Sequence, residues 1–194
     1  MEKETREALQ KIETVRDAYR RITELLILRG LTITTMESCT CGQIASLLTD
    51  TEGASAVLKG ACITYSNEAK ILQGVPASVI GQYGVYSAET AKAMASACRS
   101  MFHADIGIGI TGTFGNADPA NADSRPGCIY YAVETGKKRR TGEPGGPGEP
   151  GEQTSHPCVI VCRKELPPQQ DRLHYKMLAA AHVADTLKEI LEIL

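Results

Sequence analysis

The sequence L-T-I-T-T-M-E-S-C-T-C-G-Q-I-A-S-L-L (residues 31–48), with C-I-T-Y-S-N-E-A-K following at residues 62–70, decides the fold of this chain. The first stretch begins with a β-branched strand over residues 31–35, turns at Ser38 and continues as an apolar helix over residues 40–48. The second stretch continues a strand-like run. Strand, turn, helix and a further strand in this order are typical of an α/β protein.

The same stretches carry candidate catalytic side chains. Ser38 stands at the entrance to a helix, where unpaired backbone N–H groups and the helix dipole can stabilise an oxyanion. Tyr65 and Lys70 follow the second strand, and serine, lysine and tyrosine together suffice for amide hydrolysis. Each residue also has a structural explanation: Ser38 as an N-cap, Lys70 on a solvated helix and Tyr65 packed on a strand.

Long amphipathic helices are predicted at both ends of the chain. Over residues 4–29, apolar side chains recur at spacings of three and four, at Leu9, Ile12, Val15, Tyr19, Ile22 and Leu26. We expect residues 1–30 to form a helix that packs on the domain, with a dimerising helix as the alternative. A similar pattern predicts the last helix over residues 171–194.

Between these ends, strands alternate with helices. We predict helices over residues 67–72, 77–83 and 87–102, and strands over residues 105–111, 127–134 and 158–162. The last two strands are expected to pair as a hairpin, which makes part of the sheet antiparallel. The predicted fold is therefore a three-layer α/β/α sandwich with a mixed, mostly parallel sheet.

Residues 136–157 interrupt this pattern. They read K-K-R-R and then G-E-P-G-G-P-G-E-P-G, with glycine at every third position. The repeat is too short for a collagen triple helix, so we predict a mobile Gly/Pro-rich loop insertion. Binding of a partner by the basic residues 137–140 is the alternative interpretation.

Composition narrows the classes of function. The 194 residues, 42% hydrophobic and 23% charged, fit one domain with a sizeable core. With a net charge of −2, the chain lacks the excess of basic residues that is typical of a nucleic-acid-binding protein. No apolar run is long enough for a membrane span, and the charged N-terminus does not resemble a secretory signal. We therefore expect a cytoplasmic protein without membrane or specific nucleic-acid partners.

The seven cysteines are an odd number and fall mostly in apolar runs, which favours reduced core residues over a disulfide framework. Cys39 and Cys41 form a C-x-C pair that could join Cys158 and Cys162 in a zinc site. Their spacing and strand context argue against this, and we expect no metal.

Three candidate segments follow predicted strands: Ser38, residues 65–70 and the glycine-bearing loop over residues 111–116. In open α/β sheets the binding crevice lies outside the carboxyl ends of the strands. We therefore expect these segments to converge on one cleft.

Five short motifs, taken together, resemble the CinA C-terminal domain family. They are E-S-C-T-C-G (residues 37–42), T-Y-S-N-E-A-K (64–70), G-V-Y-S-A-E-T (84–90), I-T-G (110–112) and D-R (171–172). Several bacterial members of this family are nicotinamide-mononucleotide deamidases. The resemblance makes residues 31–194 a CinA C-terminal-like domain and implies a three-layer α/β fold, usually in a homo-oligomer.

The resemblance also implies an activity: hydrolysis of the carboxamide of nicotinamide mononucleotide to nicotinate mononucleotide and ammonia, without metal or organic cofactor. The family's nucleophilic serine, its tyrosine and its lysine fall on Ser38, Tyr65 and Lys70. Its substrate-binding segments fall on Thr111, Gly112, Gly115 and Arg172.

The chemistry sets a requirement on Lys70. No histidine is placed by these motifs to act as the base, and a free lysine, with a pKa near ~10.4, is almost entirely charged at pH 7. Burial beside Tyr65, or the nearby charge of Arg172, is expected to lower the pKa of Lys70. Tyr65 is expected to relay the proton or hold Lys70. The backbone N–H groups of Thr40, Cys41 and Gly42 are expected to face the oxyanion.

Two departures from the family pattern favour a second hypothesis. Cys41 stands where the family has glycine, and Phe114 replaces a small residue of the substrate loop, which would reshape the pocket. The alternative function is a non-catalytic nucleotide-binding or protein-interaction module on the same fold.

Overall fold

The computed structural model of the chain describes residues 2–136 and 158–193. The helices are α1 (Glu2–Arg29), α2 (Gln43–Thr49), α3 (Asn67–Leu72), α4 (Ala77–Tyr83), α5 (Ala88–Phe102) and α6 (Arg172–Ile193), with a short 3-10 helix η1 (Ala54–Ala56). The strands are β1 (Ile33–Glu37), β2 (Leu58–Ile63), β3 (Ile106–Gly112), β4 (Cys128–Thr135) and β5 (Cys158–Glu165).

The five strands form one sheet in the order β2-β1-β3-β4-β5. Strand β1 is parallel to both β2 and β3, whereas β4 is antiparallel to its neighbours β3 and β5. Strand β4 therefore alone runs against the other four. This arrangement confirms the predicted mixed, mostly parallel sheet and the predicted hairpin of its last two strands.

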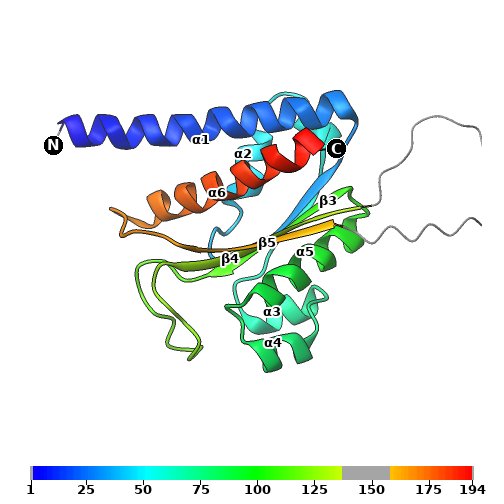
Figure 1. The fold of residues 1–194 in the computed structure, drawn as a ribbon, viewed down its shortest axis with the longest axis vertical. Helices are drawn as coiled ribbons and strands as arrows, with labels where there is room; N and C mark the ends of the chain where they lie inside the picture. Colours follow the sequence, from blue (N-terminus) through cyan, green and yellow to red (C-terminus); the bar gives the residue numbers. More distant parts are fainter. Residues whose placement is uncertain (1, 137–157, 194) are drawn as a thin grey trace, which may run out of the picture.

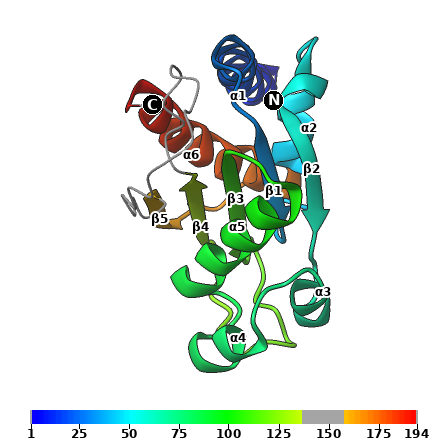
Figure 2. The same cartoon turned by 90° about the vertical axis from the view of Figure 1, so that its right-hand side faces the viewer.

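Helices cover both faces of the sheet, which confirms the predicted three layers. Helices α1, α2 and α6 lie on one face, and α5 lies on the other, with α3 and α4 beside its N-terminal end (Figures 1 and 2). Helix α5 packs closely on β3 because a Cβ atom at Gly107 or Gly109 would collide with the backbone oxygens of Ala95 and Ala91. The glycines of this strand thus permit the close backbone approach that their pattern predicted.

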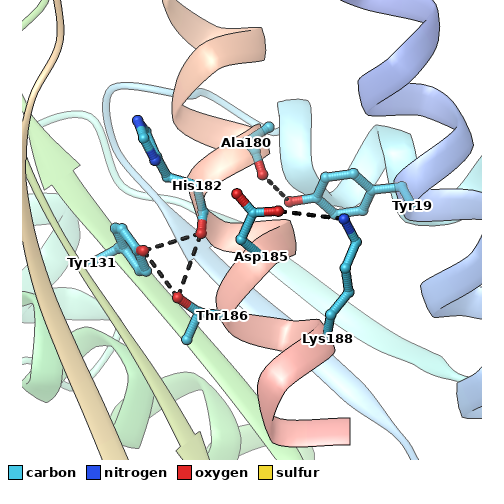
Figure 3. A network of polar contacts seen from close by, with 7 residues as sticks. All are labelled: Tyr19, Tyr131, Ala180, His182, Asp185, Thr186 and Lys188. Atoms are coloured by element: carbon cyan, nitrogen blue, oxygen red, sulfur yellow. Dashed lines mark hydrogen bonds and ion pairs between the residues drawn. The ribbon is translucent and has the colours of Figure 1, made fainter. Parts of the chain in front are cut away.

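The larger core cluster lies between the sheet and the α1–α2–α6 layer. Two tyrosines of this core keep their hydroxyls hydrogen-bonded to α6. Tyr19 of α1 donates to the Ala180 carbonyl at 3.0 Å, and Tyr131 of β4 donates to the His182 carbonyl at 3.0 Å (Figure 3). Because the two phenols come from a helix and a strand, they hold α6 between α1 and the sheet.

Several element bounds agree with the sequence and one differs in an informative way. Helices α3 and α4 span the predicted residues 67–72 and 77–83. Helix α2 begins at Gln43 rather than near residue 40, because Cys41 and Gly42 have positive φ angles of 53° and 87°. A residue with positive φ cannot continue a right-handed helix.

Smaller differences concern exposure and coverage. Leu9 was expected on the buried face of the first helix, but its side chain is exposed. The predicted loop insertion over residues 136–157 lies, apart from Gly136, outside the described residues. All seven cysteines are free thiols. Within the described part, no helix is long and apolar enough to cross a membrane.

Candidate active site

A cavity of about 450 Å³ opens where β1, β2 and β3 end. Its walls come from five segments: the turn after β1, the residues from the end of β2 to the start of α3, the connection between α4 and α5, the end of β3 with the long loop after it, and the first residue of α6. The lining side chains that matter below are Ser38, Cys39, Tyr65, Asn67, Tyr86, Phe114, Asp118, Asn121 and Arg172. The three strand-following segments therefore converge on one site, as expected from the rule for open α/β sheets.

Ser38 lines this cavity and forms a buried pair with Lys70, which is not itself among the lining residues. Lys70 Nζ lies 3.2 Å from Ser38 Oγ and donates a second hydrogen bond, of 2.8 Å, to the Thr64 carbonyl. The side chains are buried, with 6% of Ser38 and 1% of Lys70 exposed. The pair forms because β1 and β2 run parallel, with Glu37 in register with Ile63, so the segments after both strands meet.

Burial changes the acidity of the lysine. Removing the ammonium from water lowers the pKa of Lys70 to about 8, and the charges of Cys39, Asp118 and Glu68 oppose this shift. The expected effect of burial is therefore found. The expected contribution of Arg172 is not, because it is absent from the charges that act on Lys70. At pH 7 about one tenth of Lys70 is consequently the free amine, against well under one in a thousand for an ordinary lysine.

Glu37 occupies the helix end that was expected to serve an oxyanion. Its completely buried carboxylate accepts the N–H groups of Ile44 at 3.2 Å and Ala45 at 2.9 Å, both in the first turn of α2. The prediction of unpaired N–H groups at this helix end is therefore wrong. Glu37 instead has a structural hydrogen-bonding role, and it anchors the turn that carries Ser38.

The turn residues Thr40, Cys41 and Gly42, which were expected to bind the substrate, are not among the residues that line the cavity. The Cys41 N–H donates to the Ser38 carbonyl at 3.1 Å, which closes the turn. Cys41 is exposed and has φ of 53°, in the left-handed region that favours glycine. Its side chain therefore costs backbone strain without filling the cavity.

Arg172 reaches the cavity from the first residue of α6. It donates to the Tyr65 hydroxyl at 2.9 Å, and its guanidinium lies 5.6 Å from the centroid of the Phe114 ring. Within the described residues, the Tyr65 hydroxyl is hydrogen-bonded to Arg172 and not to Lys70. The structure thus joins Tyr65 to Arg172 rather than to the buried pair.

Phe114 does not block the site. Its ring is 2% exposed and stacks on Tyr175 of α6, with 5.2 Å between the ring centroids. The ring therefore belongs to the core and forms part of one cavity wall, where it supports Arg172.

The expected substrate loop divides between the cavity and its support. Gly112 lines the cavity, whereas Thr111 is buried and donates to the Val85 carbonyl at 3.0 Å. Gly115 lies against Tyr175 and does not line the cavity.

Three polar lining residues were not predicted from the sequence: Tyr86, Asp118 and Asn121. Tyr86 lies inside the recognised motif G-V-Y-S-A-E-T, which gave it no role, whereas Asp118 and Asn121 lie in a polar run after Phe114 that belongs to no motif. Among the described residues, no group of three or more His, Cys, Asp and Glu side chains could hold a metal ion.

A family model confirms what the motifs indicated. The model described as the CinA C-terminal domain matches residues 16–149, more than half of the chain. The chain belongs to the CinA C-terminal domain family. The match begins inside α1, so the first half of this helix precedes the part shared with the CinA model.

Similar proteins are found among bacterial sequences. A protein of Halothermothrix orenii, whose name refers to competence-damage induction, is 45% identical over 114 residues. A CinA-like protein of Syntrophus aciditrophicus is 39% identical over 119 residues. These alignments cover 58% and 60% of this chain but only 27% and 28% of the relatives. The chain therefore matches less than a third of the length of either protein.

Solved CinA structures share the fold. The CinA superfamily protein of Klebsiella pneumoniae has a TM-score of 0.74 at 22% identity, and the alignment covers 93% of this chain and 99% of that one. A competence/damage inducible protein of Agrobacterium tumefaciens has a TM-score of 0.71 at 24% identity, with 90% and 94% covered. At this identity the likeness extends to the fold alone.

Proposed function

We propose that this CinA domain is an amidohydrolase that deamidates nicotinamide mononucleotide to nicotinate mononucleotide and ammonia. One observation carries the proposal: Lys70 Nζ lies 3.2 Å from Oγ of Ser38, and Ser38 lines a cavity large enough for a small nucleotide. Nucleophile and base within hydrogen-bonding reach are the minimum requirement for covalent catalysis by serine.

Lys70 would act first as the base and then as the acid. The neutral amine accepts the Ser38 proton while Oγ bonds to the carboxamide carbon, which gives a tetrahedral intermediate. Lys70 then returns this proton to the amide nitrogen, the C–N bond breaks, and ammonia leaves. An ester between Ser38 and the nicotinoyl group remains. A pKa of about 8 suits both steps, because the two forms of Lys70 interconvert easily near neutral pH.

Water completes the cycle by the same route. Lys70 accepts a proton from a water molecule that attacks the ester carbon, and it then returns a proton to the departing Ser38 oxygen. The products are the free carboxylic acid and the original serine. The Cys39 N–H is the candidate oxyanion donor, because Cys39 lines the cavity and no backbone carbonyl in the described residues accepts this N–H.

Arg172 is assigned to the substrate phosphate. It is a guanidinium at the cavity wall, and guanidinium groups bind phosphate with paired hydrogen bonds. Tyr65 would assist by holding Arg172 through the 2.9 Å hydrogen bond. A substrate with a carboxamide at one end and a phosphate at the other could then span from Ser38 to Arg172.

An ammonia-release assay tests this proposal across nicotinamide, its riboside and its mononucleotide. We expect release from the mononucleotide above all, and loss of release in Ser38→Ala. Ser46→Ala is the matched control, because Ser46 is an exposed serine of α2. If the wild-type protein binds the mononucleotide in a calorimetric titration but releases no ammonia, the non-catalytic nucleotide-binding module is the better description.

A further inference from the structure

We propose that Asp118 makes the site selective for carboxamides on a positively charged ring, and so discriminates a pyridinium nucleotide from a neutral analogue of the same shape. This inference rests on the proposed function and adds a specificity-determining residue to it. Asp118 lies outside the motifs that place the chain in its family, in the loop after β3.

The Asp118 carboxylate is held by three donors. The Tyr86 hydroxyl donates to it at 2.6 Å, the Asn121 side-chain amide at 2.6 Å and the Ala120 N–H at 2.9 Å. The Tyr86 and Asn121 hydrogen bonds, followed by that of Ala120, lower the pKa of Asp118. The group is therefore a carboxylate throughout the neutral range.

The loop around Asp118 is braced from two sides. The Asn67 side chain of α3 donates to the Asn121 side chain at 3.0 Å, and the Tyr86 N–H donates to the Asp123 carboxylate at 2.9 Å. Because both contacts join the loop to residues outside it, the carboxylate has a defined place in the cavity wall. A fixed charge can discriminate between ligands better than one on a free side chain.

The charges of the cavity match a zwitterionic ligand. Asp118 and Glu68 are negative and Arg172 is positive, and all three line the cavity. Glu68 is an exposed residue in the first turn of α3, whereas Asp118 is half-buried and hydrogen-bonded. Asp118 also lies near enough to the buried pair for its charge to act on Lys70. A nucleotide with a cationic ring beside its carboxamide and a phosphate at its far end has the complementary pattern.

The phenol rings of Tyr65 and Tyr86 add to this preference, because both line the cavity and aromatic faces attract cations. A neutral ring would gain neither interaction. The acid formed by deamidation carries a new negative charge, so the same carboxylate would disfavour the product and help its release.

Paired binding measurements test the inference. Nicotinamide mononucleotide and its reduced dihydro form share carboxamide, ribose and phosphate, but only the former has a cationic ring. Calorimetric titration is done on Ser38→Ala, to prevent turnover, with and without Asp118→Asn. We expect Ser38→Ala to bind the cationic form at least about tenfold more tightly than the neutral one, and Asp118→Asn to abolish that preference by weakening the cationic form alone.

Two further variants separate charge from loop structure. Asp118→Glu keeps the charge and should keep the preference, and Asp123→Asn removes a carboxylate of the same loop that does not line the cavity and should also keep it. Three results would overturn the inference. Asp118→Asn could weaken the binding of both ligands equally, or it could leave the preference for the cationic form unchanged. Alternatively, neither ligand could bind to Ser38→Ala. If the preference depends on Asp118 but wild type releases no ammonia, the selectivity stands and the proposed deamidation fails.

Discussion

The two walls of the cavity differ in burial and in sequence. One wall carries Ser38, which pairs with the buried Lys70, and both residues stand in motifs that resemble the CinA family. The second wall is the loop after β3 that carries Asp118. It is half-buried to exposed over residues 115–126 and departs from the family pattern at the buried Phe114. Burial helps the Ser38–Lys70 pair to react, because burial lowers the pKa of the lysine. The sequence of a loop that recognises the substrate can change without disturbing this pair. The difference suggests that chemistry belongs to the first wall and selection to the second.

The largest expected effect concerns the first wall. Lys70→Met should lower the turnover number for ammonia release by about a thousandfold or more, because Ser38 loses its base. Lys70→Arg should be equally inactive, since a guanidinium stays charged at neutral pH. Lys59→Met is the matched control, because Lys59 is an exposed lysine of β2. Full activity of Lys70→Arg would remove Lys70 from the mechanism.

The second expected effect is a dependence of stability on pH. Because folding lowers the pKa of Lys70 from 10.5 to about 8, the buried ammonium destabilises the native state below pH 8. This penalty disappears as the pH rises from 8 to 10.5. Relative to Lys70→Met, the free energy of unfolding of the wild type should rise by roughly 3 kcal/mol across this window.

Urea denaturation of the wild type and Lys70→Met at several pH values measures this difference. Subtracting the two curves removes the shared titration of tyrosines and cysteines. Lys59→Met should show no such trend against the wild type. A difference that stays flat between pH 8 and 10.5 would mean that the lysine is not desolvated.

A smaller effect is expected in the second wall. Phe114→Leu removes the ring beside the Arg172 guanidinium, and a contact of this kind contributes about 0.5 to 1 kcal/mol. We expect a KM for the mononucleotide raised by roughly two- to fivefold with little change in kcat. Phe102→Leu is the control, because Phe102 is the only other phenylalanine of the chain and lies at the end of α5, outside the cavity lining. A fall in kcat alone would argue that Phe114 supports the first wall instead.

The smallest effect concerns the turn between Ser38 and α2. Cys41→Gly should raise the free energy of unfolding by about 0.5 to 1 kcal/mol, since glycine adopts a φ of 53° without strain but loses more chain entropy on folding. Thermal or urea denaturation measures the change. Cys41→Ala removes the thiol but keeps the strain, so it should bring no gain. A stabilised Cys41→Ala would assign the effect to the thiol rather than to the backbone.

Local signals in the sequence were enough for much of the fold. Helices α3 and α4 begin and end where predicted because Ser66 caps the first and Gly74 and Pro76 separate the two. The prediction that Ser38 and Lys70 lie close together came from the general rule that sites of open α/β sheets form at the carboxyl ends of the strands. Neither residue alone indicated it. Its basis in the structure is the parallel pairing of β1 with β2.

Other features depend on contacts that no local pattern contains. The Arg172–Tyr65 hydrogen bond joins residues 107 positions apart, so it depends on where α6 begins relative to β2. The hydrogen bond from Ile44 to Glu37 could be foreseen only if the start of α2 was known. The sequence predicted that start near residue 40, but the positive φ angles of Cys41 and Gly42 move it to Gln43. Asp118 has no motif at all, and only the folded loop shows that its carboxylate faces the cavity.

The pH dependence of ammonia release from nicotinamide mononucleotide, with Ser38→Ala measured beside the wild type, tests the Ser38–Lys70 assignment most directly. We expect kcat of the wild type to rise with pH and to reach half its maximum near pH 8, where Lys70 becomes neutral. Ser38→Ala should stay at background throughout. Release that does not change with pH, or that survives in Ser38→Ala, would contradict a serine nucleophile activated by this lysine.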